Sequence, residues 1–294
     1  MKSRFTFFVL FLTAVSFALL TIQPLTTVSF AAIDPKDKAA LVALYTSTNG
    51  AGWTNNTGWA DYATTNPCDD FWFGVTCSGD RVTLIVLDGN SLSGSIPPEI
   101  GDLTGLQTLS LSDNALTGSI PPSLGNLSNQ LINLYLDYNS LTGEIPAELG
   151  SLVQLLRIWL DHNNLCGTVP STLTNLDANL QDNIGLDLNN NYLDVNVSSS
   201  LGTFIADKSA GYTDWTTTQQ GVCPLDKAAL IDLYNSTNGA GWSNSTGWTA
   251  GDPCATGWFG ITCNASNTYV IRIELQENLL TGAIPASIGN LSQL

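Results

Sequence analysis

Basic residues are scarce in this sequence. Its 294 residues include 9 Lys and Arg but 25 Asp and Glu, which gives a formal net charge of −16 at pH 7. Nucleic acids and anionic membrane surfaces are bound through basic patches, so neither is an expected partner. The composition fits a soluble protein with a neutral or cationic partner. It fits equally well an exported protein whose acidity only keeps it soluble.

Residues for metal and nucleophilic chemistry are also few. No two cysteines have CxxC spacing, and His162 is the only histidine, so the usual zinc motifs are missing. No recognisable motif places a serine or cysteine as a nucleophile. We therefore expect no enzyme activity, no metal and no cofactor.

Only one long hydrophobic run is present. It extends from Phe5 to Leu20, follows the basic residues Lys2 and Arg4, and leads to small residues. This pattern predicts a signal peptide over residues 1–31, cleaved at its end, with an uncleaved signal anchor as the alternative. No other segment is apolar enough to enter a membrane. The expected location is therefore secreted or cell-surface.

The six cysteines of an exported chain predict disulfides. Two similar segments, CDDFWFGVTC and CATGWFGITC, each begin and end with cysteine, and we expect a bond within each. Cys166 and Cys223 remain; they pair with each other if both are oxidised, and a free thiol at Cys166 is the alternative. The two bonds predicted within segments are Cys68–Cys77 and Cys254–Cys263.

An internal repeat determines the expected architecture. From Val82 the pattern LxxLxLxxNxLxGxIPxxLGxL recurs four times, and a degraded fifth unit around Asn191 lacks the glycine and proline. Alternating leucines predict a short strand with one buried side. The asparagine amide can bond backbone groups of adjacent turns. Because one unit cannot bury its leucines alone, the units are expected to stack into a solenoid.

The end units of a solenoid need covers. Asp34 and Pro35 predict the start of a helix, and the segment DKAALVALYTSTNGAGW from Asp37 supplies its apolar stripe. Nearly the same segment, DKAALIDLYNSTNGAGW, returns at Asp226. It predicts a second cap and the start of a second array, which we interpret as truncated at Leu294.

A disulfide between Cys166 and Cys223 would hold the connecting segment against the end of the first array. Tyr212 and Trp215 would supply its apolar contacts. The expected parts are a signal peptide (1–31), a first cap (34–81), about five repeats (82–195), a cover or linker (196–222), a second cap (223–269) and the truncated start of a second array (270–294).

The motif NxLxGxIPxxLGxL and the preceding cap resemble the plant-type leucine-rich repeat proteins. The resemblance implies the α/β class, with a right-handed solenoid, a parallel sheet on its concave side and a disulfide-stapled helical cap. Family members include receptor ectodomains, cell-wall enzyme inhibitors and uncharacterised secreted proteins, and they usually bind peptides, proteins or glycans on the concave face. A structural or adhesive spacer in a cell wall or matrix, or the ectodomain of a longer receptor-like protein, is the alternative.

The strand register predicts which side chains point out of the concave sheet. Units three and four place aromatic residues and a histidine there, beside carboxylates and an arginine. Such a patch suits a sugar ring or a peptide with a basic residue; the bland alternative is ordinary solvated strand residues. The candidate ligand-binding residues are Tyr135, Asp137, Tyr138, Arg157, Trp159, Asp161 and His162.

Three kinds of chemistry at this patch are not expected. One carboxylate per strand makes a poor metal cage. Asp137 and Asp161 lack the closed cleft that a glycosidase pair requires. Asp161 and His162 are neighbours on one strand and should point to opposite faces, which argues against acid–base work between them.

Overall fold

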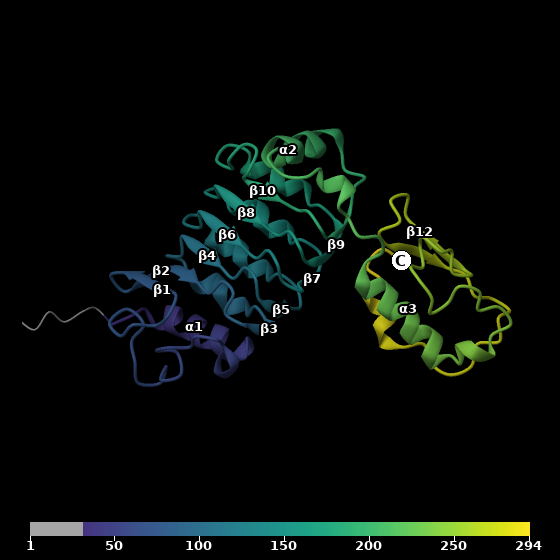
Figure 1. Cartoon of the computed structure of the whole chain (residues 1–294), viewed down its shortest axis with the longest axis horizontal. Coiled ribbons are helices and arrows are strands. Elements are labelled where there is room, and N and C mark those ends of the chain that lie inside the picture. The colour runs from purple at the N-terminus through teal and green to yellow at the C-terminus, as the bar shows by residue number, and fades with distance from the viewer. Residues whose placement is uncertain (1–31) are drawn as a thin grey trace, which may run out of the picture. The chain divides into compact units, whose positions relative to one another are not determined.

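The computed structural model describes residues 32–294, so the predicted signal peptide lies outside the described residues. No helix within the described range is long and apolar enough to span a membrane. The predicted fold class is confirmed. Capped leucine-rich units stack side by side, and their strands form a parallel sheet (Figure 1).

The first cap consists of one helix, a tryptophan cluster and a strand. Helix α1 (Pro35–Ser47) begins at Asp34, whose side chain accepts a hydrogen bond from the Lys36 amide at 2.8 Å. Trp59 and Trp72 are fully buried beneath it. The predicted Cys68–Cys77 disulfide is present. The cap ends on strand β1 (Val75–Ser78), which pairs antiparallel with β2 (Arg81–Val86).

The repeats supply the other strands of the main sheet, in the order β1-β2-β4-β6-β8-β10. From β2 onward all neighbours are parallel, and equivalent apolar residues align across them, such as Leu134 beside Ile158. The register therefore follows the sequence repeat. These strands are β4 (Thr108–Ser110), β6 (Asn133–Tyr135), β8 (Arg157–Trp159) and β10 (Leu186–Asp187).

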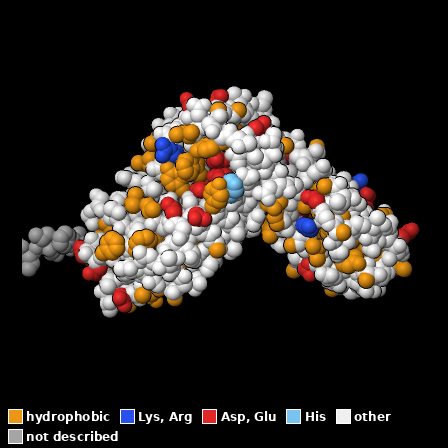
Figure 2. All heavy atoms as spheres, viewed as in Figure 1, with side chains coloured by type: hydrophobic (Ala, Val, Ile, Leu, Met, Phe, Trp, Pro, Cys, Tyr) orange, Lys and Arg blue, Asp and Glu red, His pale blue; other side chains and the backbone are white. Residues whose placement is uncertain are grey.

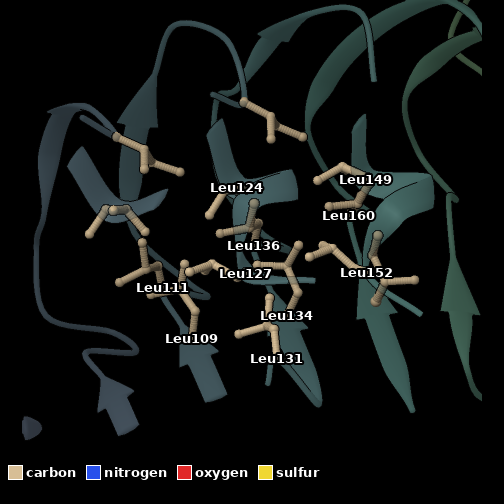
Figure 3. Packing of buried hydrophobic residues seen from close by; sticks show 14 of the residues in the cluster. Leu109, Leu111, Leu124, Leu127, Leu131, Leu134, Leu136, Leu149, Leu152 and Leu160 are labelled. Atoms are coloured by element: carbon tan, nitrogen blue, oxygen red, sulfur yellow. The ribbon is translucent and has the colours of Figure 1, made fainter. Parts of the chain in front are cut away.

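Behind this sheet the chain returns through short 3₁₀ helices and smaller parallel sheets. Leucines from both sides interdigitate and are almost completely buried (Figure 3). The 3₁₀ helices are Pro98–Asp102, Pro122–Leu127, Ala147–Ser151 and Ser171–Leu176. The smaller sheets contain β3 (Ser93–Ser95) with β5 (Ala115–Thr117), and β7 (Thr142–Gly143) with β9 (Asn164–Thr168) and β11 (Tyr192–Asp194).

The repeat asparagines connect adjacent units, as the sequence predicts. Asn163 is buried, and its amide nitrogen donates to the carbonyl of Leu136 in the preceding unit at 3.0 Å. Its side-chain oxygen accepts the Leu141 amide at 2.9 Å. Asn191 makes equivalent bonds one unit later. The side chains thus satisfy backbone groups that the turns would otherwise leave unpaired.

A helical segment covers the end of the first array. Helix α2 (Ser199–Ser209) and a 3₁₀ helix (Trp215–Thr217) pack there, and Trp215 is buried in the same core as the repeat leucines. Cys166 is bonded to Cys223, so the free-thiol alternative is wrong. The sequence pattern does not predict a helix over 199–209.

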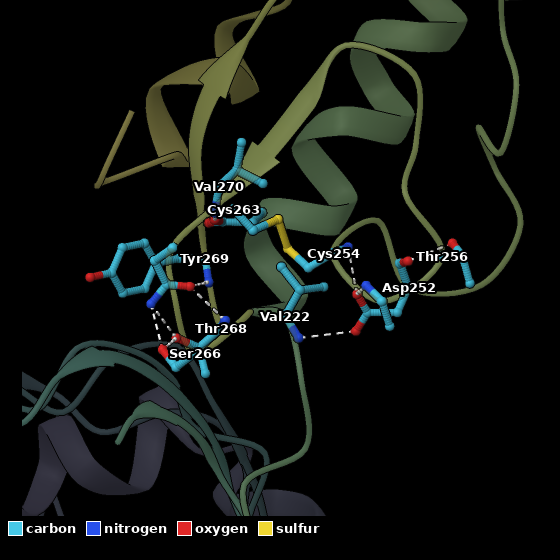
Figure 4. The surroundings of a disulfide bond; sticks show 12 residues. Val222, Asp252, Cys254, Thr256, Cys263, Ser266, Thr268, Tyr269 and Val270 are labelled. Atoms are coloured by element: carbon cyan, nitrogen blue, oxygen red, sulfur yellow. Dashed lines mark hydrogen bonds between the residues drawn. A yellow bond between two sulfur atoms is a disulfide. The ribbon is translucent and has the colours of Figure 1, made fainter. Parts of the chain in front are cut away.

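The second cap reproduces the elements of the first. Asp252 bonds the Val222 and Cys254 amides beside the predicted Cys254–Cys263 disulfide (Figure 4). Its tryptophans form a core of their own. Its elements are α3 (Pro224–Ser236), a 3₁₀ helix (Gly239–Gly241), β12 (Ile261–Cys263), β13 (Val270–Ile273) and a 3₁₀ helix (Ala286–Asn290). The first cap has a matching 3₁₀ helix at Gly50–Gly52.

Candidate functional site

Aromatic side chains gather on the side of the main sheet that faces away from the leucine core, here called the sheet face. Tyr135 of β6 and Trp159 of β8 lie side by side, with ring centroids 4.7 Å apart. Tyr138 and His162 stack with a centroid distance of 4.0 Å and an interplanar angle of 11°. The four predicted rings therefore form one patch. Figure 2 shows hydrophobic side chains gathered beside the histidine and several acidic side chains.

The backbone just after each strand explains the stack. Tyr138 and His162 both adopt left-handed conformations, with φ of 52° and 51°. The equivalent residues of the other units, Gly89, Asp113 and Asn190, adopt the same conformation, so the left-handed turn belongs to the repeat; glycine, aspartate and asparagine tolerate it better than tyrosine and histidine do. Tyr138 is 51% exposed in consequence. The two larger residues accept an unfavourable backbone conformation and present their rings to solvent.

The expectation that Asp161 and His162 point to opposite faces is wrong. The left-handed turn at His162 interrupts the strand alternation and brings its Nδ1 to 2.8 Å from Oδ2 of Asp161. The other ring nitrogen, Nε2, lies 3.0 Å from the side-chain nitrogen of Asn190. These two partners fix the plane of the imidazole ring.

Three aspartates from consecutive units line the floor beside these rings. Asp137, Asp161 and Asp187 are 9%, 7% and 7% exposed. Each has one oxygen satisfied: Asp137 by the Ser112 hydroxyl at 2.5 Å, Asp161 by His162, and Asp187 by Asn189 at 2.5 Å. No Lys or Arg nitrogen in the described chain lies within 4.0 Å of any of these carboxylates.

Burial without a full countercharge alters how these carboxyl groups titrate. It raises the pKa of Asp161 to about 6, against the opposing effect of the hydrogen bond from His162. Burial also raises the pKa of Asp137 and of Asp187, and neighbouring carboxylates add to the effect in each case. The three groups form a row of carboxylates held close together in a poorly solvated place.

A pocket of about 450 Å³ opens over this floor. Trp159 and the Tyr138–His162 stack form walls, and the loop Gly211–Thr213 of the covering segment forms another. Tyr212 meets Trp159 edge-on at 6.4 Å and donates to the Ile184 carbonyl at 3.2 Å. Burial raises the pKa of Tyr212 to about 12. The size falls in the range of ligand pockets.

Five of the seven predicted site residues line this pocket, and two lie beside it. Arg157 donates to Gln181 at 2.8 Å and to the Tyr135 hydroxyl at 3.4 Å, which fixes both side chains next to the aromatic patch. The residues that line the pocket but were not predicted for the site are Asp187, Asn189, Asn190, Gly211, Tyr212 and Thr213.

The missed residues fall into two groups. Asp187, Asn189 and Asn190 occupy the same repeat positions as predicted residues. The register places them on the concave face, but the predicted patch was confined to units three and four. No repeat signal marks residues 211–213, because they belong to the covering segment. Chemically, the arrangement offers aromatic surface and carboxylates for binding. In the described chain no three His, Cys, Asp or Glu side chains are placed to hold a metal ion.

The comparisons with known proteins cover both caps and four repeats. Residues 34–78 and 223–264 match the family described as "Leucine rich repeat N-terminal domain", and residues 81–103, 105–127, 130–152 and 154–176 match "Leucine Rich Repeat".

The relatives are plant receptor kinases and their ectodomains. The chain is 45% identical over 76 residues to the probable inactive receptor kinase RLK902 of Arabidopsis thaliana, a stretch covering 26% of this chain and 11% of that protein. It matches the crystal structure of the BIR2 ectodomain from Arabidopsis thaliana with 28% identity and a TM-score of 0.51, covering 64% of this chain and 92% of that one.

A third match is the Arabidopsis receptor kinase HAESA, solved in complex with the peptide hormone IDA and the co-receptor SERK1. The identity is 29% and the TM-score 0.50, over 57% of this chain and 28% of that one. The chain spans about a tenth of the length of the curated relatives that it matches.

Proposed function

Because this chain belongs to the leucine-rich repeat proteins that carry the leucine-rich repeat N-terminal domain, we propose that it is an extracellular recognition module. Its sheet face binds a peptide, or an exposed segment of a partner protein. It performs no chemistry of its own. The aromatic patch and the pocket bounded by Tyr138, Trp159 and Tyr212 are the contact surface.

The single observation that carries this proposal is the pocket itself. An ordinary solvated strand surface does not explain why Tyr138 stacks on His162 at 4.0 Å beside a pocket that the loop Gly211–Thr213 walls on another side. Exposed aromatic clusters of this kind mark interaction sites. They supply large contact area at small conformational cost, and the loop preorganises one wall of the site.

The relatives favour a peptide over a glycan. HAESA was solved with a peptide hormone and a co-receptor bound. Three buried carboxylates whose only basic neighbour is His162 suit a ligand of opposite charge better than a neutral sugar. We therefore place peptides and protein segments ahead of glycans, and secretion or cell-surface display as the setting.

Binding to peptide and glycan arrays tests the proposal. The full chain would be produced through a secretory pathway, so that its three disulfides form, and compared with a Tyr135→Ala/Trp159→Ala variant. A Tyr62→Ala variant, which changes an aromatic residue of the first cap, serves as control. The proposal requires a peptide hit that the double variant loses and the control keeps. A hit kept by both variants, or glycan hits alone, would contradict it.

A further inference from the structure

Each of the three aspartates on the floor of the pocket has one carboxylate oxygen without a hydrogen-bond partner among the described residues. Oδ2 of Asp137, Oδ1 of Asp161 and Oδ2 of Asp187 accept no hydrogen bond from any described residue, although the three residues are buried and the Asp161 side chain is only 10% exposed. None of these oxygens is sealed in the interior without a partner, and all three aspartates line the pocket. His162 is the only basic side chain beside these three carboxylates, and it pairs with Asp161 alone. The site therefore lacks the full countercharge that buried carboxylates require.

We propose that this pocket takes one organic cation of the ligand, an ammonium or guanidinium group, between the aspartates and the aromatic walls. The inference rests on the proposed function of the sheet face and names the chemistry that this site recognises. The group comes from a lysine or arginine side chain, or from a peptide's N-terminal amine. Its positive charge completes the floor of Asp137, Asp161 and Asp187.

The walls suit such a group as well as the floor. A cation over an aromatic face is attracted by the ring quadrupole, and Trp159 and Tyr138 both line the pocket. Guanidinium groups also stack on planar rings and bond carboxylates through two nitrogens. The protein's own arginine does not fill this role, because Arg157 is engaged by Gln181 and Tyr135 outside the pocket.

The pKa of all three aspartates is raised, as expected for carboxylates held close together and largely buried. Keeping them charged in the empty pocket therefore costs free energy. A cationic ligand recovers part of this free energy, because its charge offsets the repulsion between the carboxylates. Sites prepared in this way discriminate by charge, since a neutral group of the same shape relieves nothing.

Blocked tripeptides test the inference directly. N-acetylated, C-amidated Gly-Arg-Gly, Gly-Lys-Gly and the neutral Gly-citrulline-Gly would be titrated into the full chain by ligand-observed NMR. Triglycine amide with a free amine completes the set. The first two and the free-amine peptide distinguish the sources of the cation. We expect at least one charged peptide to bind at least fivefold more tightly than the citrulline peptide.

Two variants remove the site in different ways. Asp161→Asn/Asp187→Asn keeps the shape of the side chains and should weaken cation binding at least tenfold, whereas Asp102→Asn on the exposed surface should not. Thr213 is exposed at the pocket, so Thr213→Lys should place a tethered ammonium there and compete, while Thr213→Gln should not. The Thr213 pair answers the question even if the double variant fails to fold.

The outcomes separate this inference from the proposed function. If array ligands bind and Tyr135→Ala/Trp159→Ala abolishes their binding, but all four peptides bind equally, the cation site is wrong and the sheet-face function stands. Equal effects of Thr213→Lys and Thr213→Gln would likewise overturn the cation site. Selective binding of charged peptides, lost only in the Asp and Thr213→Lys variants, supports it.

Discussion

At the scale of single residues, the two caps differ at one buried ion pair. Asp37 is completely buried, accepts the Val82 amide at 2.8 Å and pairs with Arg81 at 2.7 Å. Its counterpart Asp226 accepts the equivalent Val270 amide at 2.8 Å. Tyr269 stands where the first cap has arginine, and burial raises the pKa of Asp226 to about 6.

This difference predicts that replacing the aspartate with asparagine has opposite effects on the stability of the two caps. The raised pKa means that folded Asp226 binds a proton more readily than the unfolded chain, so the second cap should gain stability as pH falls from about 7 to about 4. Asp226→Asn should therefore stabilise it at pH 7.5, by up to about 3 kcal/mol. Asp37→Asn should destabilise the first cap by about 2 kcal/mol, because it removes the buried partner of Arg81 and leaves only the longer, more exposed contact with Asp34.

Amide hydrogen exchange of α1 and α3 in the full chain measures each cap separately. Slower exchange in α3 for Asp226→Asn, and faster exchange in α1 for Asp37→Asn, is the expected pair of results. Destabilisation of both caps would contradict the prediction, because it would mean that the charged Asp226 carboxylate is stabilised in the folded second cap.

A second residue-scale prediction concerns pH and the ligand. Asp161, with its pKa of about 6, faces His162, Asp137, Asp187, Tyr138 and Tyr212. Below that pKa the carboxyl group is neutral and loses its attraction for a cation. The Kd of a charged blocked peptide should thus rise about tenfold between pH 7.5 and pH 5. Titrations at both values check it; a Kd that stays constant with pH would remove Asp161 from the site.

At the scale of elements, periodic positions were predictable and aperiodic ones were not. The leucines, the asparagines and the strand register repeat every 24 or 25 residues through the first four units, so their places in the sheet follow from the pattern. No repeat pattern predicts helix α2. Its sequence SSLGTFIADKS begins with two serines and contains a glycine, which are poor helix formers. The helix is therefore stabilised by its packing on the last repeat.

The covering segment is held by one covalent bond, and its removal is testable. The Cys166–Cys223 bond spans 57 residues, whereas Cys68–Cys77 spans nine. Loop-closure entropy then predicts a loss of about 4 kcal/mol for Cys166→Ser/Cys223→Ser and about 2.5 kcal/mol for Cys68→Ser/Cys77→Ser. Urea unfolding of the full chain gives both values. Equal losses for the two pairs would contradict the chain-entropy explanation.

The candidate site combines predictable and unpredictable elements. Its strand residues follow from counting back from each asparagine, which is why five of the seven predicted residues line the pocket. The side chains of Tyr138 and His162 do not themselves favour the left-handed turn, but the equivalent Gly89, Asp113 and Asn190 do, so only comparison of the units indicates it. The wall formed by residues 211–213 depends on how the covering segment folds back, which no local pattern records.

At the scale of the whole molecule, the net charge and the proposed site both favour a positively charged partner. The net charge of −16 is spread over a chain with only nine Lys and Arg, so the protein as a whole attracts positively charged partners. Such attraction accelerates encounter but does not choose a partner. Selection belongs to the pocket, where aromatic walls and three carboxylates impose shape and charge together.

The most direct test of the proposed binding site is a crystal structure of the full chain with a peptide selected on the array. We expect the peptide to lie on the sheet face, with a cationic group within hydrogen-bond distance of Asp161 or Asp187 and against Trp159 or Tyr138. A peptide ordered on either cap, or on the 3₁₀ helices behind the sheet, would contradict it.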